Sequence, residues 1–107
     1  MTKPTNSEQA LLVFLRLSDD TFGTAEDRER IFELEDQLAA AVKDAAAGEY
    51  DGHECGNGWG VLYLYGREAT HLAEAAVPLV RRFGPREGSY LVRRYGGTGA
   101  REERLTI

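Results

Sequence analysis

The segment Trp59–Tyr65 constrains the fold of this chain more than any other stretch of its sequence. Apart from one glycine, all of its side chains are aliphatic or aromatic. Because successive side chains of a β-strand point to opposite faces of the sheet, Leu62 and Leu64 share one face. The opposite face receives a more aromatic set: Trp59, Val61, Tyr63 and Tyr65. The sequence therefore predicts a sheet with two chemically unlike faces.

A hairpin is predicted immediately before this strand. Residues Glu49–Gly56 have the length of a strand, and the run Gly56-Asn57-Gly58 connects them to Trp59. Glycine and asparagine adopt positive φ angles at little cost, as tight hairpin turns require. We therefore expect the two strands to pair in antiparallel fashion.

Two segments predict helices. Thr24 followed by Asp27 forms an approximate capping box, and apolar residues then recur at helical spacing over about 25–46. A second helix is expected over 67–83, where Gly84-Pro85 ends it. The residues expected to face inward are Ile31, Leu34, Leu38, Val42 and Ala45 in the first helix and Leu72, Ala75, Ala76, Leu79, Val80 and Phe83 in the second.

The remaining segments complete the predicted order. Residues 1–9 are polar and lack periodicity, so we expect a frayed tail. Residues 10–17 predict a central strand that is apolar on both faces. Residues 89–95 predict a fourth strand, and the segment 103–107 is a candidate for a short fifth one.

The order β-α-β-β-α-β predicts an α+β fold, the ferredoxin-like split β-α-β sandwich, with an antiparallel sheet and two helices on one face. At 107 residues, the chain has the length of one ordinary domain, and we expect residues 10–107 to form it. The second sheet face is then left open. We expect this face to gather Trp59, Val61, Tyr63 and Tyr65 with Phe14 and Arg16 of the first strand, joined by an arginine and a tyrosine of the fourth.

Composition narrows the class of protein and its compartment. The net charge of −5 argues against indiscriminate binding to nucleic acid, although the second half of the chain is rich in arginine. The single cysteine excludes an internal disulfide, and the longest apolar run is too short to cross a membrane. We therefore expect a cytoplasmic protein without membrane contact.

Three interpretations of the aromatic face remain open. Tyrosine, tryptophan and arginine are the residues that most often anchor protein interfaces, which favours a partner surface or a homodimer. The stretch Gly58–Leu62 has a partial likeness to the base-stacking strand of RNA recognition motifs, but Asn57 and Val61 depart from that pattern. In the third interpretation, the aromatic residues are ordinary strand formers or lie under a terminal segment.

A second candidate site lies around His53 and Cys55, which share one face of their strand. A further ligand, for example His71, would be needed to complete a zinc site, because the sequence has no paired C-x-x-C or H-E-x-x-H motif. Cys55 with a histidine base is a conceivable nucleophile by residue type alone. We assign no catalytic residue, no metal ligand and no cofactor here, and keep a metal- or thiol-dependent enzyme as a minor alternative.

Several short motifs carry a family resemblance over residues 24–107. Residues 48–54, 62–66, 78–80 and 94–96 make the chain resemble a group of small uncharacterised bacterial proteins with a ferredoxin-like fold. The resemblance implies that fold and a bacterial cytoplasmic origin, and it implies no activity. From the residues themselves we expect a non-enzymatic interaction or regulatory module that associates with itself through the open face, with binding of single-stranded RNA as the alternative.

Overall fold

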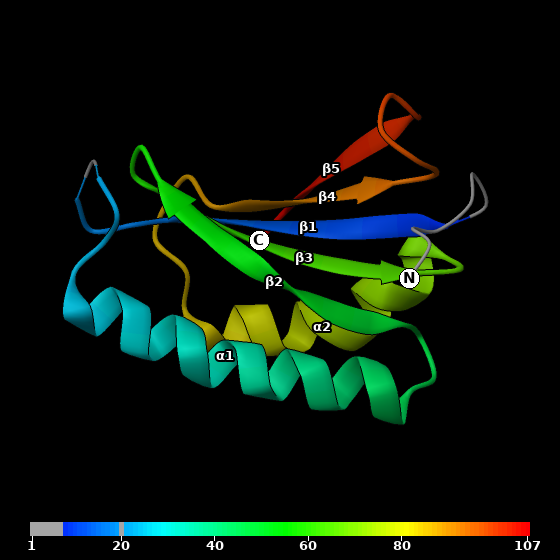
Figure 1. The fold of residues 1–107 in the computed structure, drawn as a ribbon, viewed down its shortest axis with the longest axis horizontal. Helices are drawn as coiled ribbons and strands as arrows, with labels where there is room; N and C mark the ends of the chain where they lie inside the picture. Colours follow the sequence, from blue (N-terminus) through cyan, green and yellow to red (C-terminus); the bar gives the residue numbers. More distant parts are fainter. Residues whose placement is uncertain (1–7, 20) are drawn as a thin grey trace.

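The computed structural model describes residues 8–19 and 21–107, and the first seven residues of the expected N-terminal tail lie outside this part. Within the described residues, two helices and five strands follow one another (Figure 1). In order they are β1 (Gln9–Arg16), α1 (Ala25–Asp44), β2 (Glu49–Gly56), β3 (Trp59–Gly66), α2 (Ala69–Phe83), β4 (Tyr90–Arg94) and β5 (Glu102–Thr106).

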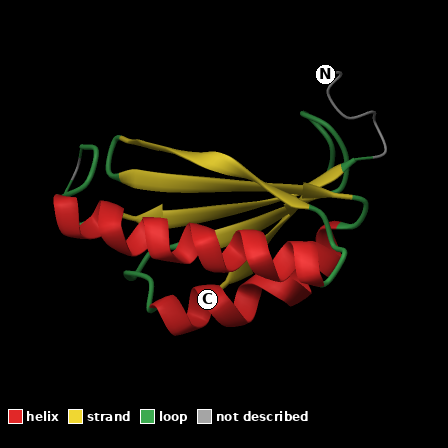
Figure 2. Cartoon of the chain, turned by 60° about the horizontal axis from the view of Figure 1, so that its bottom comes forward, coloured by secondary structure: helices red, strands yellow, loops and turns green. Residues whose placement is uncertain are grey.

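The five strands form one antiparallel sheet in the order β2-β3-β1-β4-β5, so β1 is its central strand. Both helices lie on the same side of this sheet (Figures 1 and 2). The expected α+β architecture, with an antiparallel sheet and two helices, is therefore confirmed. The C-terminal segment pairs with β4 and widens the sheet by one strand, so it does not fold back across the sheet face.

The element boundaries differ from the expected ones by a few residues. The first strand begins at Gln9, inside the expected tail, because Gln9 pairs with Gly66 at the end of β3. The first helix ends at Asp44 because Ala46 adopts a left-handed conformation, with a φ angle of 53°. The second helix begins at Ala69, two residues later than expected, and the N–H of Ala69 donates to the side chain of Gln9.

The hydrophobic core lies between the helices and one face of the sheet. The alternating residues Leu11, Val13 and Leu15 of β1 are buried, as are Leu62 and Leu64 of β3. The helices cover them with Ile31, Leu34, Leu38 and Val42 of α1 and Leu72, Ala76 and Val80 of α2. Leu79, expected in the core, packs against its margin and is partly exposed.

Asp27 joins the start of α1 to the end of β1. Its backbone N–H donates to the Thr24 hydroxyl, and its carboxylate accepts the N–H of Thr24, which is the predicted capping box. The same carboxylate oxygen accepts the hydroxyl and the N–H of Ser18. Burial alone would raise the pKa of Asp27, but the hydrogen bonds from Ser18 and Thr24 outweigh it and lower the pKa to about 2.

The predicted hairpin turn between β2 and β3 is confirmed. Asn57 and Gly58 have φ angles of 53° and 84°, which a two-residue hairpin turn requires. The carbonyl of Gly58 accepts hydrogen bonds from the N–H of Leu17 at 2.9 Å and the guanidinium of Arg16 at 2.7 Å. A side chain at position 58 would collide with Arg16, because an added Cβ would lie 2.1 Å from its Nη1. The turn is thus tied to the end of the central strand.

Candidate interaction surface

The face of the sheet that the helices leave uncovered is called the open face below. The register places Phe14 opposite Val61 and Arg16 opposite Trp59, and residues directly opposite each other share a face. By the same pairing, Tyr63 lies opposite Leu12 and Tyr65 opposite Ala10. All six residues predicted for this face therefore lie on it, and each is partly exposed: Phe14, Arg16, Trp59, Val61, Tyr63 and Tyr65.

The structure identifies the contributions of the last two strands to the open face. Tyr90 pairs with Phe14 and Arg94 with Ala10, so these are the tyrosine and arginine expected from the fourth strand. Arg104 of β5 pairs with Val92 and also points to the open face. Sequence reasoning missed Arg104 because the existence of β5, and therefore its register, depends on pairing between distant segments.

Three rings form an aromatic cluster near one end of the strands. The rings of Phe14 and Tyr90 are stacked, with their centroids 4.7 Å apart and their planes inclined by 11°. Trp59 meets both rings edge to face, at centroid distances of 6.4 Å from Phe14 and 5.7 Å from Tyr90. Both are favourable geometries for aromatic pairs, so the three rings stabilise one another's orientation.

Two arginines lie over rings of this cluster. The guanidinium carbon of Arg104 lies 3.8 Å from the centroid of Tyr90, and that of Arg16 lies 5.4 Å from the centroid of Trp59. Phe14 of β1 and Arg104 of β5 reach Tyr90 from the strands on its two sides, so both faces of the Tyr90 ring are occupied. The surface thus consists of rings already packed against other side chains.

Tyr63 extends the open face toward β2. Its hydroxyl donates to Glu54 at 2.7 Å. This hydrogen bond to a carboxylate, together with burial, raises the pKa of Tyr63 to about 12. The phenol is therefore neutral near pH 7 and is held in one orientation.

The charges of the open face are divided between its two sides. Glu49 and Glu54 of β2 form an acidic flank, as their pairing with Tyr65 and Val61 places them on this face. Arg94 and Arg104 form a basic flank, where Glu102 lies opposite Arg94. With Arg16 between the flanks, this set holds three positive and three negative charges. The open face is thus close to neutral although the chain has a net charge of −5.

The second candidate site gathers different partners from those considered in the sequence. Nδ1 of His53 lies 2.7 Å from Oε2 of Glu35 on α1, and the hydroxyl of Tyr50 donates to the same oxygen. His71 lies on α2, away from this strand, and no group of three metal-ligating side chains occurs within residues 8–19 and 21–107. Burial is the main cause that raises the pKa of Cys55, which keeps it as a thiol near pH 7. The geometry therefore joins His53 to a carboxylate and gives Cys55 no thiolate character.

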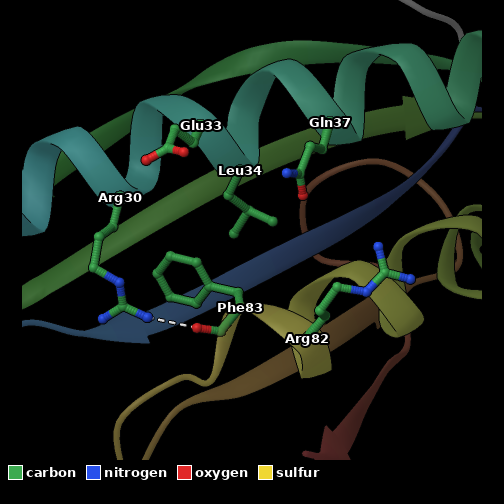
Figure 3. A pocket seen from close by; sticks show the side chains of 6 residues that line it. All are labelled: Arg30, Glu33, Leu34, Gln37, Arg82 and Phe83. Atoms are coloured by element: carbon green, nitrogen blue, oxygen red, sulfur yellow. Dashed lines mark hydrogen bonds between the residues drawn. The ribbon is translucent and has the colours of Figure 1, made fainter.

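A hollow of about 190 Å³ between the two helices is lined in part by Arg30 and Arg82 (Figure 3). The guanidinium of Arg30 donates a hydrogen bond to the carbonyl of Phe83, and its carbon lies 4.2 Å from the centroid of the Phe83 ring. Because free carbonyl groups occur at the C-terminal end of a helix, this contact caps α2 and joins it to α1. Arg30 is thus occupied in helix packing.

Neither helix in the described part of the chain has the length and apolar composition needed to cross a bilayer. Comparisons with protein-family models, curated proteins and solved structures found no match for this chain. The function is therefore inferred from the geometry of the open face.

Proposed function

We propose that this protein is a non-enzymatic interaction module that associates with itself through the open face, on a ferredoxin-like fold widened by β5. One observation carries the proposal: a complete sheet face, opposite both helices, presents partly exposed tryptophan, tyrosine, phenylalanine and arginine side chains in fixed mutual contacts. Large apolar patches on a free monomer usually mark an interaction surface. Rings that are ordered in advance also lose little conformational freedom on binding.

The edges of the sheet are less suited to association than its face. The outer strand β2 carries Glu49, Asp51 and Glu54, and its pairing with β3 shifts register between Tyr50 and Gly52. The opposite edge, β5, is also rich in charged residues. Charges and bulges on edge strands oppose pairing with another chain. We therefore place the contact on the face.

Binding of single-stranded RNA by base stacking is the alternative use of the same face. Stacking needs a ring face that a base can cover. Phe14 and Arg104 occupy the two faces of Tyr90, and Arg16 lies over Trp59. The acidic flank on β2 also repels phosphate. These contacts support a protein partner over a nucleic acid.

Tyr63→Glu tests self-association directly. The substitution removes the hydrogen bond to Glu54 and places a second carboxylate beside it, and a dimer contact would bury this added charge. We expect the wild type to be a dimer at micromolar concentration in multi-angle light scattering and Tyr63→Glu to be a folded monomer. Gln37→Glu is the matched control, because it adds the same charge at an exposed position of α1 and should leave the dimer intact.

A wild type that remains monomeric at high micromolar concentration would rule out self-association. If that monomer bound a single-stranded RNA oligonucleotide, with the affinity lost in Trp59→Ala and Tyr63→Ala, base stacking would replace the present proposal. Each stacked base contributes about 1 to 3 kcal/mol, so the loss would be easily measured.

A further inference from the structure

We infer that Asn57 is a site of spontaneous deamidation and that the fold keeps this reaction slow through its contacts with Gly58. Asn57-Gly58 is the only Asn-Gly sequence in the chain. Asparagine before glycine deamidates readily in flexible chains, because glycine has no side chain to hinder attack by its nitrogen. The reaction is confined to the hairpin turn, so it is independent of the proposed self-association.

The chemistry takes place within these two residues and consumes one water molecule. The backbone nitrogen of Gly58 loses its proton and attacks the side-chain carbonyl carbon of Asn57, which closes a five-membered succinimide ring. The bond from that carbon to the side-chain amide nitrogen breaks, and ammonia leaves with the added proton. Water then opens the ring at either carbonyl and leaves aspartate or isoaspartate, each with one new carboxylate.

In the folded chain, the attacking nitrogen is held by a hydrogen bond. Gly58 is buried, and its N–H donates to the carbonyl of Thr21 at 2.8 Å. Thr21 is positioned in turn by Asp19, whose carboxylate accepts the N–H groups of Thr21 and Gly23 at 3.0 Å each. Loss of the Gly58 proton would break the bond to Thr21, and burial keeps water and bases from this N–H. The nitrogen is therefore a poor nucleophile in the closed turn.

The conformation of Asn57 also opposes ring closure. Its φ angle of 53° lies in the left-handed region, where ψ is about +47°. With ψ in this range, the nitrogen of Gly58 lies nearly opposite to Cβ of Asn57 about the Cα–C bond and cannot reach the side-chain carbon. Rotation about that bond would move the Gly58 N–H away from Thr21. It would also move the Gly58 carbonyl away from the N–H of Leu17 and the guanidinium of Arg16.

Deamidation at Asn57 therefore requires that the turn opens locally. Isoaspartate at this position adds a carbon to the backbone of a two-residue turn. The hydrogen bonds from Gly58 to Thr21 and to the end of β1 then cannot re-form in their original geometry. The product is a permanent mark of a chain whose turn has opened.

Peptide mapping by mass spectrometry tests the inference on the full chain. The rate of deamidation at Asn57 is measured in the folded protein and in the same protein unfolded in urea, at equal pH and temperature. We expect the folded chain to react at least about tenfold more slowly, because only the opened turn reacts. Equal rates in the two states would overturn the inference.

Asp19→Ala tests whether the contact to Gly58 is the cause. The variant removes the acceptor that positions Thr21, so we expect amide hydrogen exchange of Gly58 and deamidation at Asn57 both to be faster by at least about threefold. Asp36→Ala is the matched control, because it removes the same charge from an exposed position of α1 and should change neither rate. Circular dichroism checks that both variants are folded. Faster exchange of Gly58 without faster deamidation would contradict the proposed protection.

Discussion

The two faces of this sheet are formed by the same strands, yet they differ in side-chain chemistry and in burial. On the helix-covered face, the side chains of β1 and β3 are aliphatic and almost fully buried, as Leu11 and Leu62 illustrate. On the open face, most of the neighbouring residues of the same strands remain partly exposed, and they include aromatic residues and an arginine. The comparison teaches that one alternating sequence can encode a buried core and an exposed aromatic face at the same time.

The difference in side-chain chemistry follows from what covers each face. On the covered face, the helices pack apolar side chains against the sheet, so its leucine and valine side chains are almost fully buried and stabilise the fold. Without helices, the rings of Phe14, Trp59 and Tyr90 contact one another and the guanidinium groups of two arginines instead. Such contacts cover the rings only in part and leave apolar area that a second protein can cover.

The largest expected effect is on the helix-covered face. Leu38 is fully buried between α1 and the sheet, so Leu38→Ala removes apolar contacts and leaves a cavity. We expect a loss of about 2 to 5 kcal/mol in the free energy of unfolding, measured by urea denaturation of the monomeric Tyr63→Glu background. An unchanged denaturation midpoint would contradict the assignment of this face as the core.

Asp27→Asn should have the next largest effect, because it weakens the hydrogen bonds that join β1 to α1. We expect a loss of about 1 to 3 kcal/mol near pH 7. The pKa of Asp27 is about 2 in the folded protein, below its ordinary value of 3.8, so the carboxylate stabilises the fold above about pH 4. The difference between wild type and variant should therefore shrink as the pH falls from 4 toward 2. A difference that stays constant over this range would exclude the charge of Asp27 as its source.

On the open face, Tyr90→Leu keeps an apolar side chain and removes the stacking with Phe14 and the contact with Arg104. Aromatic pairs contribute about 0.5 to 1.5 kcal/mol beyond the area that they bury, so we expect a loss of that size in the free energy of unfolding. Association should weaken as well, because the aromatic cluster loses its order. Equal association of variant and wild type in sedimentation experiments would remove the cluster from the interface.

The smallest effect is expected at Cys55, on the helix side of β2. Cys55→Ala should change the free energy of unfolding by about 1 kcal/mol or less and leave association intact. Purified protein should contain no stoichiometric zinc by elemental analysis. One equivalent of metal that disappears in Cys55→Ala or His53→Ala would restore the metal-site alternative.

Features that depend on local periodicity could be predicted from the sequence, whereas contacts between distant segments could not. The alternation of Trp59–Tyr65 and the turn at Asn57-Gly58 are encoded in consecutive residues, and the structure has both as predicted. The contact between Glu35 and His53 joins a helix to a strand edge, and the position of Arg104 over Tyr90 depends on the pairing of β5. No pattern in neighbouring residues signals contacts of this kind.

Trp59 offers the most direct measurement of the central claim, because it is the only tryptophan of the chain and lies on the open face. Its fluorescence can be followed from nanomolar to high micromolar protein, with acrylamide quenching at each concentration. If copies associate through this face, emission should move to shorter wavelength and quenching should fall as concentration rises, while Tyr63→Glu shows neither change. Emission and quenching that stay constant in the wild type over the whole range would contradict association through the open face.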